Sequence, residues 1–285
     1  MKVGILARID KPQAAELAAS LRAALSSKGV EVLLERRTAS LLGEAAGHTE
    51  EELSQSCDLV VALGGDGTIL RALHRMGGKI PPIFGINLGS LGFLTGVSSE
   101  EWSDAVESIV AGNYRLSARS LLRVELERDG RVAETFLGLN DAVVSRGQHS
   151  QLIKIEVRVD GEELCVYNAD GLIFATPTGS TAYSMSAGGP LLLPDSASLV
   201  LTPICPHALT NRSAVVPDTS RLELRLVGDA PGVTVNVDGQ EIRELGSRDV
   251  LRISRAEEKL QLATLPGLTF SEVLREKLKW SGSNV

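Results

Sequence analysis

The chain has 285 residues, 43% of them hydrophobic and 23% charged, a composition typical of a soluble globular protein with room for two domains. Its formal net charge of −7 argues against nucleic acid or an anionic membrane as the main partner, because both favour a basic surface. We expect neither a signal peptide nor a membrane span, since no apolar run approaches the roughly 20 residues that cross a bilayer. The wide spacing of Cys57, Cys165 and Cys205 predicts neither a zinc site nor a disulfide framework, and it favours the reducing cytoplasm.

The first third of the chain alternates between strand and helix patterns. Short apolar runs predict buried strands at 3–7, 30–34, 59–63 and 82–87. Helices are expected from Asp10, with Pro12 in the first turn, to residue 27, and again at 69–76 and 100–111. Residues 35–56 are predicted to form a loop with one short helix. This alternation indicates an α/β domain with a parallel sheet over residues 1–113.

Beyond Gly112 the β signals dominate. Three Asp-Gly pairs, at 129–130, 160–161 and 238–239, each separate two β-rich runs, as the turn of a hairpin does. We therefore expect an antiparallel, sandwich-like β-rich domain over residues 114–265. Residues 270–280 read as a helix, and the segment 266–285 is expected to pack back on the first domain.

The first candidate site is the sequence Gly-Gly-Asp-Gly-Thr at 64–68, between a predicted strand and a predicted helix. In a parallel sheet this position lies at the carboxyl edge, where ligands bind. Glycines allow the backbone to approach a phosphate, and the helix N-terminus offers free N–H groups to an anion. Asp66 is a carboxylate in a place that suits anions, so a metal, a hydroxyl proton or a cation should meet it. The alternative is a glycine-rich turn with Asp66 as the helix cap.

The second candidate follows Asp170-Gly171 and an apolar run, and spans Thr-Pro-Thr-Gly-Ser-Thr-Ala-Tyr-Ser at 176–184. Its hydroxyl and amide groups could bind phosphate or ribose, and Tyr183 could stack on a base. Residues 186–190 continue as a loop suited to close approach. A Ser/Thr-rich turn without a ligand is the alternative.

The third candidate is Asn140-Asp141, predicted to lie within an apolar strand at 137–144. A polar pair inside such a strand must find partners if it is buried. Asn suits a nucleobase edge, and a carboxylate suits the two hydroxyls of a ribose. The alternative is a turn at the end of a strand.

Five motifs in order resemble the NAD kinase family, also called polyphosphate/ATP-NAD kinase, over nearly the whole chain. They are GGDGT at 64–68, LND at 139–141, DG at 170–171, TPTGSTAYSMSAGGP at 176–190 and CPHAL at 205–209. GGDGT is shared with diacylglycerol kinase, sphingosine kinase and 6-phosphofructokinase relatives. The block at 176–190 makes the resemblance specific to the NAD kinase family. The resemblance implies transfer of the γ-phosphoryl group of ATP to the 2′-hydroxyl of the adenosine ribose of NAD.

The resemblance also implies roles for individual residues. Asp66 resembles the catalytic aspartate, the base for the ribose hydroxyl. Asn140 and Asp141 resemble the pair that holds NAD; the family often has Glu at the second position, so Asp141 keeps the charge with a shorter reach. The further residues implied in substrate or nucleotide binding are Gly65, Gly67, Thr68, Arg71, Gln151, Asn168, Asp170, Thr178, Thr181, Ala182, Tyr183, Ser184, Ser186 and Gln240.

The same resemblance implies Mg²⁺ or another divalent cation bound with ATP, and a homodimer or homotetramer. No acidic cluster marks a metal site held by the protein, so the nucleotide is expected to supply most of the ligands. Other hypotheses remain. A lipid kinase of the diacylglycerol type would share GGDGT but would not need the block from 176. A 6-phosphofructokinase would lack the β-rich second half. A non-catalytic NAD sensor would keep the binding loops and would have no need of Asp66.

Overall fold

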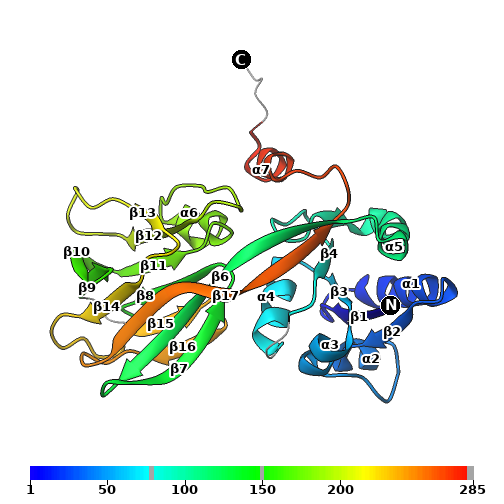
Figure 1. Cartoon of the computed structure of the whole chain (residues 1–285), viewed down its shortest axis with the longest axis horizontal. Coiled ribbons are helices and arrows are strands. Elements are labelled where there is room, and N and C mark those ends of the chain that lie inside the picture. Colours follow the sequence, from blue (N-terminus) through cyan, green and yellow to red (C-terminus); the bar gives the residue numbers. More distant parts are fainter. Residues whose placement is uncertain (77–79, 148–150, 281–285) are drawn as a thin grey trace. The chain divides into compact units, whose positions relative to one another are not determined.

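The structure is a computed structural model that describes residues 1–76, 80–147 and 151–280, except for the side chains of Glu241 and Ile242 (Figure 1). The chain forms two compact units. One consists of Met1–Ala118 with Leu260–Val285, and the other is Arg119–Lys259. The expected segment 266–285 falls in the first unit, and its last residues, 281–285, lie outside the described residues.

The first unit is built on a parallel sheet. Strands β1 (Lys2–Ala7), β2 (Glu31–Leu34), β3 (Leu59–Leu63) and β4 (Ile83–Asn87) lie in the order β2-β1-β3-β4. Strand β4 also pairs in parallel with β5 (Val97–Ser98) and with Leu262 and Ala263 at the end of β17 (Val250–Thr264). Both β3 and β4 are fully buried, as expected of strands covered on both faces. The predicted α/β architecture is confirmed.

Helices cover both faces of this sheet. Helices α1 (Ala14–Ser27) and α5 (Trp102–Ala111) share an apolar cluster with alternate residues of β1, β3 and β4. Helices α3 (Glu50–Ser56) and α4 (Asp66–Arg75) pack on the other face, where Gly4 approaches Leu53 and Gly85 approaches Ile69. The helix expected at 270–280 is α7 (Phe270–Leu278), and a 3-10 turn, η1 (Ser99–Glu101), precedes α5.

Three expectations for this unit were wrong in detail. Helix α1 begins at Ala14 and not just after Asp10, because the Asp10 carboxylate is paired with Arg8 instead of capping a helix. Residues 35–56 hold two helices, α2 (Arg36–Leu41) and α3. Glu35 accepts hydrogen bonds from the first amides of α2, and Thr49 with Glu52 forms a capping box on α3. Helix α4 begins at Asp66, three residues before the expected start.

The second unit is an antiparallel β sandwich, as predicted (Figure 1). In one sheet the order is β13 (Ala214–Pro217), β12 (Ser198–Ile204), β11 (Gly171–Ala175), β8 (Asp141–Ser145), β15 (Thr234–Val237) and β16 (Glu241–Glu244). The other contains β10 (Glu162–Ala169), β9 (Ile153–Val159), β14 (Leu222–Leu226) and the first part of β17, with β6 (Arg115–Arg128) and β7 (Arg131–Gly138). One apolar cluster takes residues from both sheets, so the core lies between them.

The hairpin predictions are confirmed. Asp129, Asp160 and Asp238 have φ of 49°, 53° and 51°, and the glycine after each also has a positive φ. Two consecutive residues of this kind make the turn that matches the twist of a hairpin. The placement of the pair Asn140-Asp141 within one strand at 137–144 was wrong for Asn140, which lies in a bend, whereas Asp141 is the first residue of a strand. Strand β7 ends at Gly138 and β8 begins at Asp141, so Asn140 lies where the chain bends between two strands.

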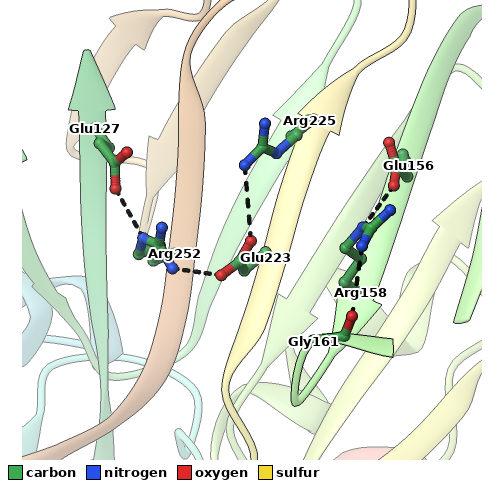
Figure 2. Close-up of polar contacts among 7 residues, drawn as sticks. All are labelled: Glu127, Glu156, Arg158, Gly161, Glu223, Arg225 and Arg252. Atoms are coloured by element: carbon green, nitrogen blue, oxygen red, sulfur yellow. Dashed lines mark hydrogen bonds and ion pairs between the residues drawn. The ribbon is translucent and has the colours of Figure 1, made fainter. Parts of the chain in front are cut away.

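Figure 2 shows ion pairs on the polar side of four strands in the second unit. Arg252 of β17 contacts Glu127 of β6 at 2.8 Å on one side and Glu223 of β14 on the other. On β9, Arg158 pairs with Glu156 at 2.7 Å. Leucine, isoleucine and valine alternate with these charges and point into the core. None of the helices in the described part of the chain is long and apolar enough to cross a membrane.

Candidate active site

A pocket of about 240 Å³ lies at the carboxyl edge of the parallel sheet in the first unit. The strand order places the ends of β1, β3 and β4 side by side there, followed by Arg8, by Gly64 and by the loop after Asn87. The residues that line the pocket are Arg8, Lys11, Gly65, Asp66, Asn87, Leu88, Gly89, Ser90, Leu91, Gly92 and Lys277. This edge is where open α/β sheets bind their ligands.

The Gly-Gly-Asp-Gly-Thr motif makes the tight turn from β3 into α4. A Cβ atom on Gly64 would overlap Thr68 Oγ1, so the turn requires glycine there. The amide of Thr68 donates to the carbonyl of Gly65 at 2.8 Å, which starts the helix with Asp66 in its first turn. Of the predicted residues of this motif, Gly65 and Asp66 line the pocket, Gly67 is exposed, and buried Thr68 faces back toward Gly64.

The Asp66 carboxylate is held by the loop after β4. Its Oδ2 accepts the amide of Phe93 at 2.9 Å. Its Oδ1 accepts the amides of Leu94 at 3.0 Å and Thr95 at 3.2 Å, and the Thr95 hydroxyl at 3.2 Å. The carboxylate is half-buried and borders the pocket. Its position is therefore set by contacts between residues nearly thirty apart in the sequence.

Cations surround the rest of this pocket. Arg8, Lys11 and Lys277 all line it, and Arg8 also forms a two-pronged pair with Asp10, with Nε–Oδ1 at 2.8 Å. The hydrogen bond to Asp10 raises the pKa of Arg8, so its guanidinium stays charged. Lys277 belongs to α7 and lies 5.9 Å from the centre of the Phe93 ring, which is also 6.3 Å from the ring of Phe270. Three cations around one carboxylate suit a multiply charged anion such as a polyphosphate chain.

Arg71 lies outside the residues that line this pocket. It is half-buried on α4. Burial is the largest influence and lowers its pKa. The charges of Glu35 and Glu50 raise this pKa, and those of Arg37 and Arg75 lower it. The Nε and Nη2 atoms of Arg71 are buried and have no hydrogen-bond partner among the described residues.

The second group of candidate residues lies in the second unit, around Asn140 and Asp141. The amide of Thr176 donates to the carbonyl of Asn140 at 2.9 Å, and the Thr176 hydroxyl donates to the carbonyl of Leu139. A Cβ atom on Gly179 would overlap the Asn140 carbonyl, so glycine is needed at this close approach. The loop at 139–141 and the loop that begins at 176 are thus locked together, which brings two of the sequence candidates to one place.

Asp238, in the third Asp-Gly hairpin turn, holds this region from another strand. Its carboxylate accepts the amides of Leu139 and Asn140, both at 2.7 Å, and that of Asp141 at 3.1 Å. The amide of Asp238 in turn donates to the carbonyl of Asp141 at 3.0 Å. These bonds satisfy the backbone donors at the bend between β7 and β8.

Asp141 is a buried carboxyl group, 6% exposed. Burial and, to a smaller extent, the neighbouring Asp238 charge together raise its pKa to about 7, against a lowering contribution from the amide of Tyr183. Near neutral pH this group therefore exchanges between a hydrogen-bond donor and a charged acceptor. Both forms can bind the hydroxyl of a sugar.

The hydroxyl residues that follow divide into two kinds. Thr178 Oγ1 is buried and has no hydrogen-bond partner among the described residues. Thr181 donates to the carbonyl of Thr178 at 3.0 Å, and Ser184 shares a 2.8 Å hydrogen bond with Thr202. Around them Tyr183 and Ser186 are exposed and Ala182 is half-buried, in and before the short helix α6 (Tyr183–Ser186) that follows η2 (Gly179–Thr181).

Four further predicted residues lie in the second unit. Asp170 is paired with Arg146, with 2.7 Å between Oδ1 and Nε. Asn168 of β10 is half-buried, and its carbonyl accepts the amide of His207 at 2.8 Å. Gln151 and Gln240 are both exposed, before β9 and in the third hairpin turn respectively.

Sequence reasoning missed the loop after β4 and the cations at the pocket. The signal for the loop was present, since Asn87 ends a predicted strand and Gly89 and Gly92 follow it, as glycines follow β3. Adjacent parallel strands end at the same edge, so this loop was a candidate neighbour of Asp66. No local pattern pointed to Lys277, which comes from the far end of the chain.

Comparisons with known proteins show which family the chain resembles. The family model described as ATP-NAD kinase N-terminal domain matches residues 3–114, and the one described as ATP-NAD kinase C-terminal domain matches residues 139–265. The NAD kinase of Solibacter usitatus is 41% identical over 277 residues, which cover 97% of this chain and 96% of that protein. The NAD kinase of Moorella thermoacetica is 43% identical over 284 residues, which cover 99% of this chain and 90% of that protein.

Solved structures give the same result. Yeast NADH kinase in complex with NADH superposes with a TM-score of 0.92 at 25% identity, covering 100% of this chain and 89% of that one. An NAD kinase from Archaeoglobus fulgidus in complex with ATP superposes with a TM-score of 0.75 at 27% identity, covering 98% of this chain and 96% of that one. Together with the two family models, which account for most of the sequence, these relatives show that the chain belongs to the NAD kinase family.

Proposed function

We propose that Asp66 is the base of an ATP-dependent NAD kinase reaction, in which the γ-phosphoryl group of ATP moves to the 2′-hydroxyl of the adenosine ribose of NAD. The observation that carries this proposal is the position of the Asp66 carboxylate, on a pocket lined by three cations at the edge of the parallel sheet. As a member of the family, the chain is a phosphotransferase that uses NAD and ATP. The product is NADP.

The proposed phosphoryl transfer forms one bond to the γ-phosphorus and breaks another. The bond between the ribose 2′-oxygen and the γ-phosphorus forms while the bond from that phosphorus to the bridging oxygen breaks, and ADP leaves with the electron pair. The hydroxyl proton passes to Asp66. Because phosphoryl transfer has a loose transition state, positioning and charge neutralisation supply most of the rate. Lys11, Lys277 and Arg8 are the cations available for neutralisation at this pocket.

The divalent cation belongs to the nucleotide in this proposal. The described residues include no group of three or more His, Cys, Asp or Glu placed to hold a metal ion. The pocket offers one carboxylate, whose oxygens already accept several hydrogen bonds, so its residues fit a cation that takes its ligands from phosphates and water. When bound, Mg²⁺ would neutralise charge on the phosphates.

Asn140 and Asp141 are proposed to hold NAD in the second unit, with Thr178. The support is local: Asp238 and Thr176 fix the backbone at 139–141, and the buried Thr178 hydroxyl has no partner among the described residues. A buried hydroxyl without a partner is costly unless a ligand supplies one. Tyr183, half-exposed in the same region, is proposed to contact the base. The other binding residues listed from the sequence, of which Gly67 is the first and Gln240 the last, are likewise proposed to bind substrate or nucleotide.

Neither alternative activity is supported by the family models or by the relatives named above, which are all NAD or NADH kinases. A lipid kinase would share the Gly-Gly-Asp-Gly-Thr motif but would not need the Ser/Thr-rich block from residue 176. A non-catalytic NAD sensor would have no need of a carboxylate in a cationic pocket.

The test is NADP formation from NAD and Mg-ATP by the purified protein and by Asp66→Asn. The variant keeps the shape of the side chain and removes the base, so we expect its kcat to fall at least about a hundredfold while NAD still binds. Repeating the assay with polyphosphate as the donor and with NADH as the acceptor defines the substrate range. If the unmutated protein binds NAD but forms no NADP with any donor, the proposed kinase activity is rejected and the protein is a non-catalytic NAD sensor.

We further propose a homodimer or homotetramer in the cytoplasm. The family resemblance supports the first statement, and the widely spaced cysteines support the second. Analytical ultracentrifugation at concentrations from micromolar upward measures the oligomeric state, and a single monomeric species throughout that range would contradict the proposal.

A further inference from the structure

Thr95 donates its hydroxyl to the carboxylate of Asp66, and Asn87 donates to that hydroxyl oxygen; neither residue belongs to the five sequence motifs named above. We infer that they are positioning residues for Asp66: they fix the carboxylate through Oδ1 and leave Oδ2 as the oxygen that accepts the hydroxyl proton. This inference rests on the proposed role of Asp66 as the base.

The hydrogen bonds divide unequally between the two carboxylate oxygens. Oδ1 accepts three donors: the amides of Leu94 and Thr95 and the Thr95 hydroxyl. Oδ2 accepts one, the amide of Phe93. An ionised carboxylate has about four acceptor positions, two on each oxygen. Oδ1 is therefore saturated, and Oδ2 keeps one position for a further donor such as a ribose hydroxyl.

Asn87 fixes the direction of the Thr95 hydroxyl. The Asn87 Oδ1 accepts the amide of Gly89 at 2.7 Å, so its Nδ2 must be the donor on the other side. That Nδ2 donates to the carbonyl of Ser90 at 2.6 Å and to Thr95 Oγ1 at 2.8 Å. Because Thr95 Oγ1 accepts from Asn87, its own hydrogen is left to point at Asp66.

Close packing leaves this network little room to shift. A Cβ atom on Gly92 would overlap both Asp66 Oδ1 and Thr95 Oγ1. The Thr95 methyl group lies against Gly85 of β4, where a Cβ atom would come within 2.9 Å of it. Thr95 is fully buried and Asn87 is 4% exposed, so water cannot readily replace either donor.

Two substitutions at Thr95 separate hydrogen bonding from packing. Thr95→Val keeps the volume and the methyl group but removes the hydroxyl, whereas Thr95→Ser keeps the hydroxyl and removes the methyl group. Because Thr95→Val loses a hydrogen bond to a charged group, we expect its kcat to fall by about tenfold or more. The KM values for NAD and ATP should stay within about twofold of the parent values. Thr95→Ser should retain most of the parent kcat. Asn87→Asp, which replaces the donor with an acceptor, should lower kcat at least as much as Thr95→Val.

Thr38→Val is the matched control. The Thr38 hydroxyl is also buried in the first unit, accepts the amide of Ala7 at 2.8 Å and donates to the Glu35 carboxylate at 3.0 Å, but Thr38 does not line the pocket. Its replacement removes the same kind of bond and should lower the thermal midpoint while leaving kcat at the parent value. If Thr95→Val and Thr95→Ser lose the same activity, or if Thr38→Val loses as much as Thr95→Val, packing explains the effect and the inference fails.

The double variant Asp66→Asn with Thr95→Val completes the experiment. If Thr95 acts through Asp66, adding Thr95→Val to Asp66→Asn should change the residual kcat by less than about twofold. A further loss equal to that of Thr95→Val alone would place the action of Thr95 elsewhere and overturn the inference. Asp66→Asn with the parent kcat would instead reject the proposed base itself. A low kcat for Asp66→Asn beside a parent kcat for Thr95→Val would reject only the positioning role.

Discussion

At the scale of single residues, Asp141 couples the candidate NAD site to pH. Its pKa in the folded chain is raised to about 7 by burial and by Asp238, against 3.8 for an ordinary Asp. Between these two values the folded chain holds more protons than the unfolded chain, so the free energy of unfolding falls as pH rises through this window and is flat above it. A buried carboxyl group in the site thus lowers stability at neutral pH.

Asp141→Asn should therefore remove this pH dependence. We expect the variant to gain stability relative to the parent at pH 8 and to gain little at pH 4, by up to a few kcal/mol at roughly 1.4 kcal/mol per pKa unit. Urea unfolding at the two pH values measures the difference. Asp229→Asn, at an exposed position, is the control and should change neither value. An equal effect of Asp141→Asn at both pH values would contradict the raised pKa.

At the scale of elements, helix α7 contributes to a pocket formed mainly by the ends of β1, β3 and β4. A capping box of Thr269 and Glu272 fixes its start. Leu268, just before the helix, fills the space left by Gly96, where a Cβ atom would overlap it. Phe270 and Lys277 both contact the ring of Phe93, whose amide binds Asp66. The helix therefore supports the loop that holds the carboxylate.

Lys277→Met tests the contribution of this helix to binding of the phosphate donor. Removing a cation from the pocket while keeping the length of the side chain should raise the KM for ATP by about tenfold, because charge-assisted hydrogen bonds contribute about 1.5–3 kcal/mol. The KM for NAD should change little. Lys279→Met, two residues along and outside the pocket lining, is the matched control. Steady-state kinetics with each substrate varied in turn gives both constants, and an unchanged KM for ATP in Lys277→Met would exclude this role.

At the scale of the whole molecule, the residues proposed for binding NAD and for catalysis belong to different compact units. Asn140, Asp141 and Thr178 lie within Arg119–Lys259, whereas Asp66 lies within the unit that contains the chain's first residues. A ligand that binds the folded chain stabilises it by about 2.7 kcal/mol at a concentration one hundred times its Kd. Because the two sets of residues lie in different units, substitutions in one unit should affect binding of NAD and substitutions in the other should affect turnover. The stabilisation by NAD measures the binding.

Thermal unfolding with and without NAD checks this separation. Asp66→Asn should keep the rise in midpoint that NAD produces in the parent protein, while Asn140→Ala should lose most of it. The unliganded midpoints serve as the control for folding. Loss of the NAD-dependent rise in Asp66→Asn, or its retention in Asn140→Ala, would contradict the proposed assignment of roles.

The sequence by itself determined the local features of this protein. Continuous apolar runs predicted the buried strands β1, β3 and β4, and three Asp-Gly pairs predicted hairpins, because each signal is contained in a few neighbouring residues. Ordered motifs also indicated the family and singled out Asp66. Where local signals competed, the expectations were wrong: Asp10 pairs with Arg8 instead of capping a helix, and the chain bends at Asn140 because Asp238 binds the amides there.

Only the tertiary structure decided which distant residues meet. The loop from Asn87 to Thr95 reaches Asp66 because β4 lies beside β3, and Lys277 reaches the same pocket from the other end of the chain. Asp238 meets Leu139 across nearly one hundred residues because β15 pairs with β8. Strand order and register set these contacts, and the period of a sequence pattern specifies the face of a strand but not its neighbour.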